Sequence, residues 1–139
     1  MPGEFSNVGA FDALDSITGR ATITSGTTYL ALLTAVPTDT TTPATMTEYT
    51  ATGYSRLAVT WSPPALNGSS IPETSNTALL TFGPFTGGTG ATISGLALVT
   101  SSSGTSGVLK AWWTPDVNRT PAVNDYIQLA IGALKLTVD

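Results

Sequence analysis

One segment of the chain carries hydrophobic side chains at the period of a helix. Within residues 6–19, apolar side chains recur at every third position, namely at Val8, Phe11, Leu14 and Ile17. This spacing predicts a short amphipathic helix. Ser6 or Asn7 can cap its first turn, and Gly19 is a natural stop. We expect this helix to lie on the rest of the domain or on a neighbouring subunit.

Most of the other apolar segments have the patterns of β-strands. Residues 29–35 are apolar on both faces, which predicts a buried central strand. Residues 93–100 and 108–114 are apolar runs on either side of a Ser- and Gly-rich turn, so they predict a hairpin. Shorter runs predict further strands at residues 54–61, 77–82, 126–131 and 134–138.

Polar, turn-rich segments separate the predicted strands. Residues 38–52 form a long Thr-rich connection, and residues 65–75 form a polar loop in which Asn67-Gly68 is a turn signal. About seven strands with turns between them predict an all-β fold, either a β-sandwich or a barrel-like domain. We therefore expect residues 1–19 to form an N-terminal arm or short helix and residues 20–139 to form a single β domain.

Composition supports the all-β prediction. The chain of 139 residues contains 26 Thr and 13 Ser, whereas only 10 % of its residues are charged. Thr is β-branched and favours strands, and a mainly helical protein needs more charged residues for its solvated faces. The length suits one domain.

The charge and the missing residue types exclude several functions. A net charge of −4 and five scattered basic residues argue against binding to nucleic acid or to anionic lipid. The chain contains no His and no Cys, which removes Ser-His-Asp and Cys-His nucleophiles, His- or Cys-based zinc sites and disulfides. We find no signal-peptide pattern and no apolar run near the ~18 residues of a membrane helix, so we expect a soluble protein made without a signal.

The acidic residues form no recognisable catalytic or metal-binding motif. Asp12 and Asp15 stand three positions apart on the predicted helix, where stabilisation of the helix dipole is the favoured interpretation over catalysis. The other acidic residues lack the close spacing of a calcium-binding loop. We therefore predict no catalytic residues, no metal site and no cofactor.

Two adjacent tryptophans need separate environments. Trp112 and Trp113 lie next to each other on a predicted strand and therefore point to opposite faces. One can lie in the core, while the other must face a second layer, a partner or solvent. The favoured interpretation is that another subunit covers one of them. The alternative is an exposed Trp that stacks on a sugar ring.

Several short blocks of sequence follow one another in a fixed order. They are Phe11-Asp12-Ala13-Leu14, Tyr29-Leu30-Ala31-Leu32, Thr34-Ala35-Val36-Pro37-Thr38, Gly53-Tyr54-Ser55-Arg56, Ala58-Val59-Thr60-Trp61, Ser75-Asn76-Thr77, Leu80-Thr81-Phe82 and Gly132-Ala133-Leu134-Lys135-Leu136-Thr137-Val138-Asp139. They are distributed along the chain from residue 11 to residue 139. Their order resembles a family of short structural proteins of tailed bacteriophages, often labelled tail-fibre or minor virion proteins.

The resemblance implies a non-enzymatic component of the virion. On this basis we expect a capsid decoration or minor capsid protein that binds the major capsid protein on the outer shell. We expect it to self-associate as a dimer or trimer. The candidate interface residues are Phe5, Phe11 and Leu14 in the N-terminal segment, together with Trp112 and Trp113.

Two alternatives stay open. A tail-fibre or minor tail protein would bind tail proteins and contact the host surface, and it would expose aromatic side chains at loop tips, here Tyr49, Tyr54, Trp112 or Trp113. A carbohydrate-binding module or glycan-degrading enzyme would need an exposed Trp platform or two carboxylates facing across a groove.

Overall fold

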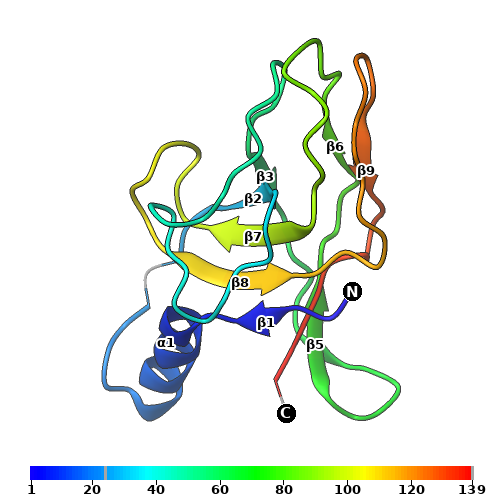
Figure 1. The fold of residues 1–139 in the computed structure, drawn as a ribbon. Helices are drawn as coiled ribbons and strands as arrows, with labels where there is room; N and C mark the ends of the chain where they lie inside the picture. Colours follow the sequence, from blue (N-terminus) through cyan, green and yellow to red (C-terminus); the bar gives the residue numbers. More distant parts are fainter. Residues whose placement is uncertain (24, 139) are drawn as a thin grey trace.

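The computed structural model describes residues 1–23 and 25–138, and these residues form a mostly antiparallel β fold with a helix near the N-terminus (Figure 1). The helix α1 spans Asn7–Thr18. The described strands are β1 (Glu4–Phe5), β2 (Thr28–Leu33), β3 (Leu57–Val59), β4 (Ala65–Leu66), β5 (Pro72–Ser75), β6 (Leu80–Phe82), β7 (Gly95–Val99), β8 (Leu109–Trp113), β9 (Ile127–Leu129) and β10 (Lys135–Thr137). The all-β prediction is confirmed, but the described part of the chain has ten short strands instead of about seven and forms no closed barrel.

The strands are arranged in three sheets. The largest has the order β1-β8-β7-β2-β3, a second has the order β10-β5-β4, and β6 pairs with β9 in a third. The predicted hairpin is confirmed as β7 and β8, which pair antiparallel. The predicted strand at residues 54–61 is confirmed only over β3.

The central strands bury side chains on both faces, as the apolar run at residues 29–35 predicts. On one face Leu30 and Leu32 join the main core, which also contains Trp113. On the other face Ala31 and Leu33 join a smaller core. The alternation of side chains along a strand therefore fills two apolar layers, one on each side of the sheet.

A bulge in β8 changes which face its residues occupy. Leu98 pairs with Ala111 and Val99 pairs with Leu109, so Lys110 is an extra residue in β8. The extra residue moves Leu109 to the smaller core, whereas Ala111 lies in the main core. The carbonyl of Lys110 turns toward the N-terminal segment and accepts a hydrogen bond from the backbone N–H of Ser6 at 3.0 Å.

The first 19 residues are built into the β domain at several points. Strand β1 pairs with β8 and forms an edge of the largest sheet, and Gly3 donates a backbone hydrogen bond to Lys135 of β10 at 2.7 Å. The predicted caps of α1 are confirmed, because the Ser6 side chain accepts from Gly9 and Gly19 ends the helix in the left-handed conformation. In the described residues α1 is too short to span a bilayer, and the same part of the chain holds no other helix that could do so.

Two polar segments are more ordered than loops usually are. The segment at residues 65–75, which we expect to be a loop, forms the β4–β5 hairpin, and Asn67-Gly68 lies in its turn. In the Thr-rich connection, the hydroxyls of Thr41 and Thr45 accept hydrogen bonds from the backbone N–H groups of Thr38 and Thr42. The Thr side chains thus stabilise two successive turns through hydrogen bonds to the backbone.

Candidate binding surfaces

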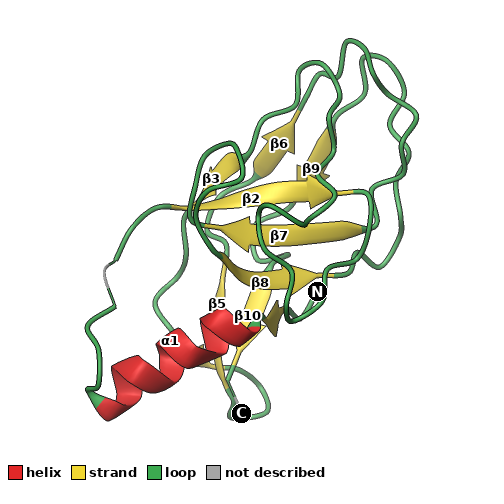
Figure 2. Ribbon diagram, turned by 60° about the vertical axis from the view of Figure 1, so that its left-hand side comes forward, coloured by secondary structure: helices red, strands yellow, loops and turns green. Residues whose placement is uncertain are grey.

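The helix α1 exposes its largest apolar side chains to solvent. Phe11 is 61 % exposed, Leu14 is 59 % exposed and Ile17 is 77 % exposed. We call these three residues, together with the 42 % exposed Val8, the α1 stripe. Figure 2 shows α1 projecting from the sheets, with its C-terminal end farthest from them. Large apolar side chains that a helix exposes outside the core mark an interaction surface.

The opposite side of α1 packs on β8 through small and paired residues. Gly9 is buried against the bulge, so closely that a Cβ atom added there would lie 2.1 Å from the carbonyl oxygen of Lys110. Asp12 forms an ion pair with Lys110, and Asp15 binds Arg20 through two hydrogen bonds of 2.6 and 2.7 Å. The acidic side chains of the helix are therefore neutralised within the chain.

The candidate interface residues separate into exposed and buried groups. Phe11 and Leu14 lie in the α1 stripe, whereas Phe5 is half-buried against the main core. Trp113 is fully buried, stacks on Trp61 with ring centroids 6.2 Å apart, and donates a hydrogen bond to the carbonyl of Lys135 at 3.0 Å. Trp112 lies in the smaller core of the same chain. The two tryptophans do point to opposite faces, but the expectation that another subunit covers one of them is wrong.

A polar cluster that the sequence analysis did not identify surrounds Arg56. Its side chain is 2 % exposed, and all five of its N–H donors are used. Two donate to the carboxylate of Glu48, and three donate to Ser101 and Gly104. Tyr54 also donates to Glu48 at 2.6 Å, and burial followed by this hydrogen bond raises the pKa of Tyr54 well above its usual range. The cluster joins three loops into a fixed arrangement.

The end of the fold opposite α1 is formed by three long connections, at residues 50–54, 83–90 and 119–126, which we call the loop end. Backbone hydrogen bonds join the first two between Thr52 and Gly87, and join the last two between Phe85 and Asp125. Figure 1 shows the three segments together at its top, far from α1. The bonds give this end an ordered surface despite its lack of long strands.

The aromatic side chains expected at loop tips lie elsewhere. Tyr49 is 1 % exposed and packs edge-on against Phe85, and Tyr54 is half-buried in the Arg56 cluster. Trp112 and Trp113 are buried as well. The expectation of exposed residues at these four positions is therefore wrong. The exposed aromatic residue of the loop end is Tyr126, which is 55 % exposed.

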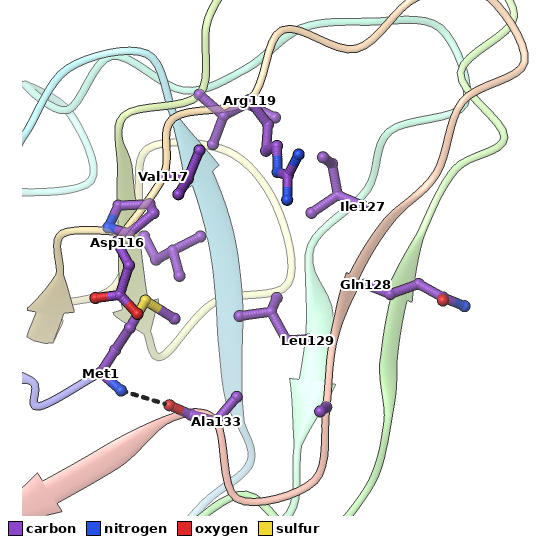
Figure 3. A pocket seen from close by; sticks show the side chains of 12 residues that line it. Met1, Asp116, Val117, Arg119, Ile127, Gln128, Leu129 and Ala133 are labelled. Atoms are coloured by element: carbon purple, nitrogen blue, oxygen red, sulfur yellow. Dashed lines mark hydrogen bonds between the residues drawn. The ribbon is translucent and has the colours of Figure 1, made fainter.

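A cleft of about 510 Å³ lies between the segment that follows β8 and strand β9 (Figure 3). Its walls include the apolar side chains of Val117, Ile127 and Leu129. Asp116 and Arg119 supply charged groups, and Figure 3 shows them on different sides of the cleft. A cleft of this size that combines apolar side chains with a few polar groups has the character of a small-ligand site.

These surfaces are typical of a class of proteins that bind partners through their surfaces. Among the described residues, no group of three or more Asp or Glu side chains is placed to hold a metal ion. The surface features described above are an apolar helix stripe, an ordered loop end and a cleft whose walls include apolar side chains. Such features serve binding and assembly.

A comparison with protein families identifies the group to which this class belongs. The family described as podophage GP4 fiber I protein gp80 matches residues 4–137. The chain therefore belongs to this family of phage virion structural proteins, as the sequence resemblance predicts. A comparison with curated proteins gave no match.

Proposed function

We propose that the chain is a subunit of a phage tail fibre and that it acts by non-covalent contact, without chemistry of its own. The observation that carries the proposal is the family match over residues 4–137, whose description names a fibre protein. This description favours the tail-fibre alternative over the expectation of a capsid decoration protein. The α1 stripe and the loop end support the same function, because a fibre subunit needs one surface for assembly and another that faces outward.

The α1 stripe is the proposed assembly surface. Phe11, Leu14 and Ile17 together present on the order of 350 Å² of apolar area, similar to the largest patches on soluble monomers, which are often functional. Burial of this area, at roughly 25 cal/mol per Å², would favour association. A stable interface buries about 800 Å² on each partner, so the stripe would form the apolar centre of such an interface.

The occupant that fits the stripe best is a second copy of this chain. The stripe contains no charged side chain that would require an oppositely charged partner. Two copies of a chain with a net charge of −4 repel each other in general. At α1, however, Asp12 and Asp15 are paired with Lys110 and Arg20, so two stripes can approach without opposing unpaired charges.

Replacing Phe11 and Leu14 by glutamine should disrupt self-association without unfolding the helix. Both side chains are mostly exposed, and glutamine is a good helix former. We expect the wild-type chain to form dimers or trimers in analytical ultracentrifugation, and we expect the double variant to associate at least about 100-fold more weakly.

The matched control replaces two exposed leucines that lie away from α1. Leu66 and Leu79 are 69 % and 54 % exposed, so their replacement by glutamine removes a similar apolar area. This control should associate as the wild type does. A wild-type chain that stays monomeric at high concentration, or equal association of the two double variants, would contradict the proposed surface.

Point substitutions are a better test than deletion of residues 1–19. The deletion would also remove β1 from the edge of the sheet and the hydrogen bond from Gly3 to β10. A truncated chain that failed to bind particles could therefore be unfolded at this edge. The glutamine variants leave β1 and the contact of Gly9 with β8 in place.

A further inference from the structure

The cleft beside β9 contains a basic side chain that the fold does not use. Four of the five basic residues form ion pairs within the chain, namely Arg20, Arg56, Lys110 and Lys135. Among the described residues, Arg119 forms none, although Asp116 lines the same cleft. The guanidinium of Arg119 is therefore available to a ligand.

The backbone of Arg119 is held in place although its side chain is free. Its N–H donates to the carbonyl of Ile93 at 3.2 Å, and its carbonyl accepts from the N–H of Ile93 at 2.7 Å. Ile93 is 3 % exposed and belongs to the main core, so it anchors this pair. Thr120 adds a side-chain hydrogen bond to Thr92 at 2.7 Å. Such anchoring reduces the entropy that a ligand must overcome on binding.

We infer that the cleft binds an anionic saccharide. The carboxylate or phosphate group of the sugar would bind Arg119, since a guanidinium can bind such an anion with two parallel hydrogen bonds. The carboxylate of Asp116 would accept hydrogen bonds from sugar hydroxyls at the other side. The C–H face of the ring would pack on Val117 and Leu129.

The chemistry of the walls favours a sugar over other anions. An inorganic anion would need only a cationic group, Arg119 or the N-terminal ammonium of Met1, and would leave the apolar wall unoccupied. A sugar ring with an anionic group would use both the cation and the wall. The volume of about 510 Å³ is larger than a bare anion needs and suits a small organic ligand. A fatty acid would cover the wall but would leave no hydroxyl for Asp116.

The test is a titration of the isotope-labelled chain followed by nuclear magnetic resonance. The probes are D-galacturonate, D-glucose 6-phosphate, uncharged D-galactose and acetate. We expect saturable shifts at the amides of Val117 and Arg119 with at least one of the two anionic sugars, at a dissociation constant on the order of 1 mM. D-galactose and acetate should bind at least about tenfold more weakly.

Substitutions then locate the site. Arg119→Gln should weaken binding of the anionic sugar by about tenfold or more, because it removes the charge that pairs with the ligand. Arg20→Gln removes the same charge outside the cleft and should leave the affinity unchanged. Val117→Ser should weaken binding of the anionic sugar but should leave binding of acetate unchanged.

The outcomes separate the alternatives. Preference for galacturonate identifies a carboxylated sugar, preference for glucose 6-phosphate identifies a phosphorylated one, and either supports the inference. Equal binding of acetate, equal losses in the two arginine variants, or no saturable shift with either anionic sugar at about 20 mM would overturn it. The titration uses the purified chain, so its failure would leave the proposed fibre function and the α1 test unaffected.

Discussion

Replacing Arg56 by alanine should lower the free energy of unfolding by about 3 kcal/mol. The substitution removes five hydrogen bonds: two to its partner Glu48, and three that hold Ser101 and Gly104 against residues 48–56. The Arg56 side chain is 2 % exposed, so water does not replace these bonds in the native state. Denaturant unfolding followed by tryptophan fluorescence measures the loss.

Arg20→Ala is the matched control for the Arg56 prediction. Arg20 also binds a carboxylate through two short hydrogen bonds, but its side chain is 74 % exposed. Solvent screening limits an exposed pair to less than about 1 kcal/mol. Similar losses of unfolding free energy in the two variants would mean that burial does not determine how much the Arg56 cluster contributes to stability.

Replacing Gly9 by alanine should destabilise the protein by about 2–3 kcal/mol, although alanine is the better helix former by about 1 kcal/mol. The added Cβ would lie 2.1 Å from the carbonyl oxygen of Lys110, so α1 must move away from the bulge of β8. That movement weakens the hydrogen bonds from Ser6 to Leu109 and Lys110. Thermal unfolding followed by circular dichroism provides the measurement.

The control for Gly9 is a glycine in open space. A Cβ added at Gly68 would meet no atom within 4 Å, and Gly68 does not have a positive φ. Gly68→Ala should therefore change stability by no more than about 0.5 kcal/mol. Stabilisation by Gly9→Ala would show that intrinsic helix preference outweighs packing and that α1 is not fixed on β8.

Local signals account for the elements that the sequence predicted well. The caps of α1, Ser6 and Gly19, act within one turn of the helix, so their meaning does not depend on the rest of the fold. The apolar run of β2 and the β7–β8 hairpin are equally local, because a short turn brings the hairpin strands together. Each of these elements can therefore be recognised from a continuous stretch of sequence, although the pairing of β2 with β3 and β7 cannot.

The features that the sequence did not predict depend on distant partners. Strand β1 has two residues, and only its pairing with β8, about a hundred positions later, makes it a strand. Arg56 looks like a surface residue until Glu48 and the 101–104 loop surround it. The sequence does not show which basic residue lacks an ion pair. The structure shows that the other four are paired, which leaves the Arg119 side chain available.

The sequence also could not show which of the candidate interface side chains are exposed and which are buried. The helical pattern identified Phe11 and Leu14 as apolar anchors, and the structure places both on an exposed face. The signal that could have indicated the packed face is Gly9, the smallest residue of the helix, since a helix approaches a strand most closely where a side chain is absent. The burial of Trp112 depends on the smaller core, which forms from β2, β7 and β8 together.

The number of copies of this chain in each purified virion tests the central claim most directly. Quantitative gel densitometry against the major capsid protein would measure it. A tail-fibre subunit that assembles in small groups predicts a handful of copies per particle. Hundreds of copies per particle would contradict this account and would indicate a protein of the capsid shell.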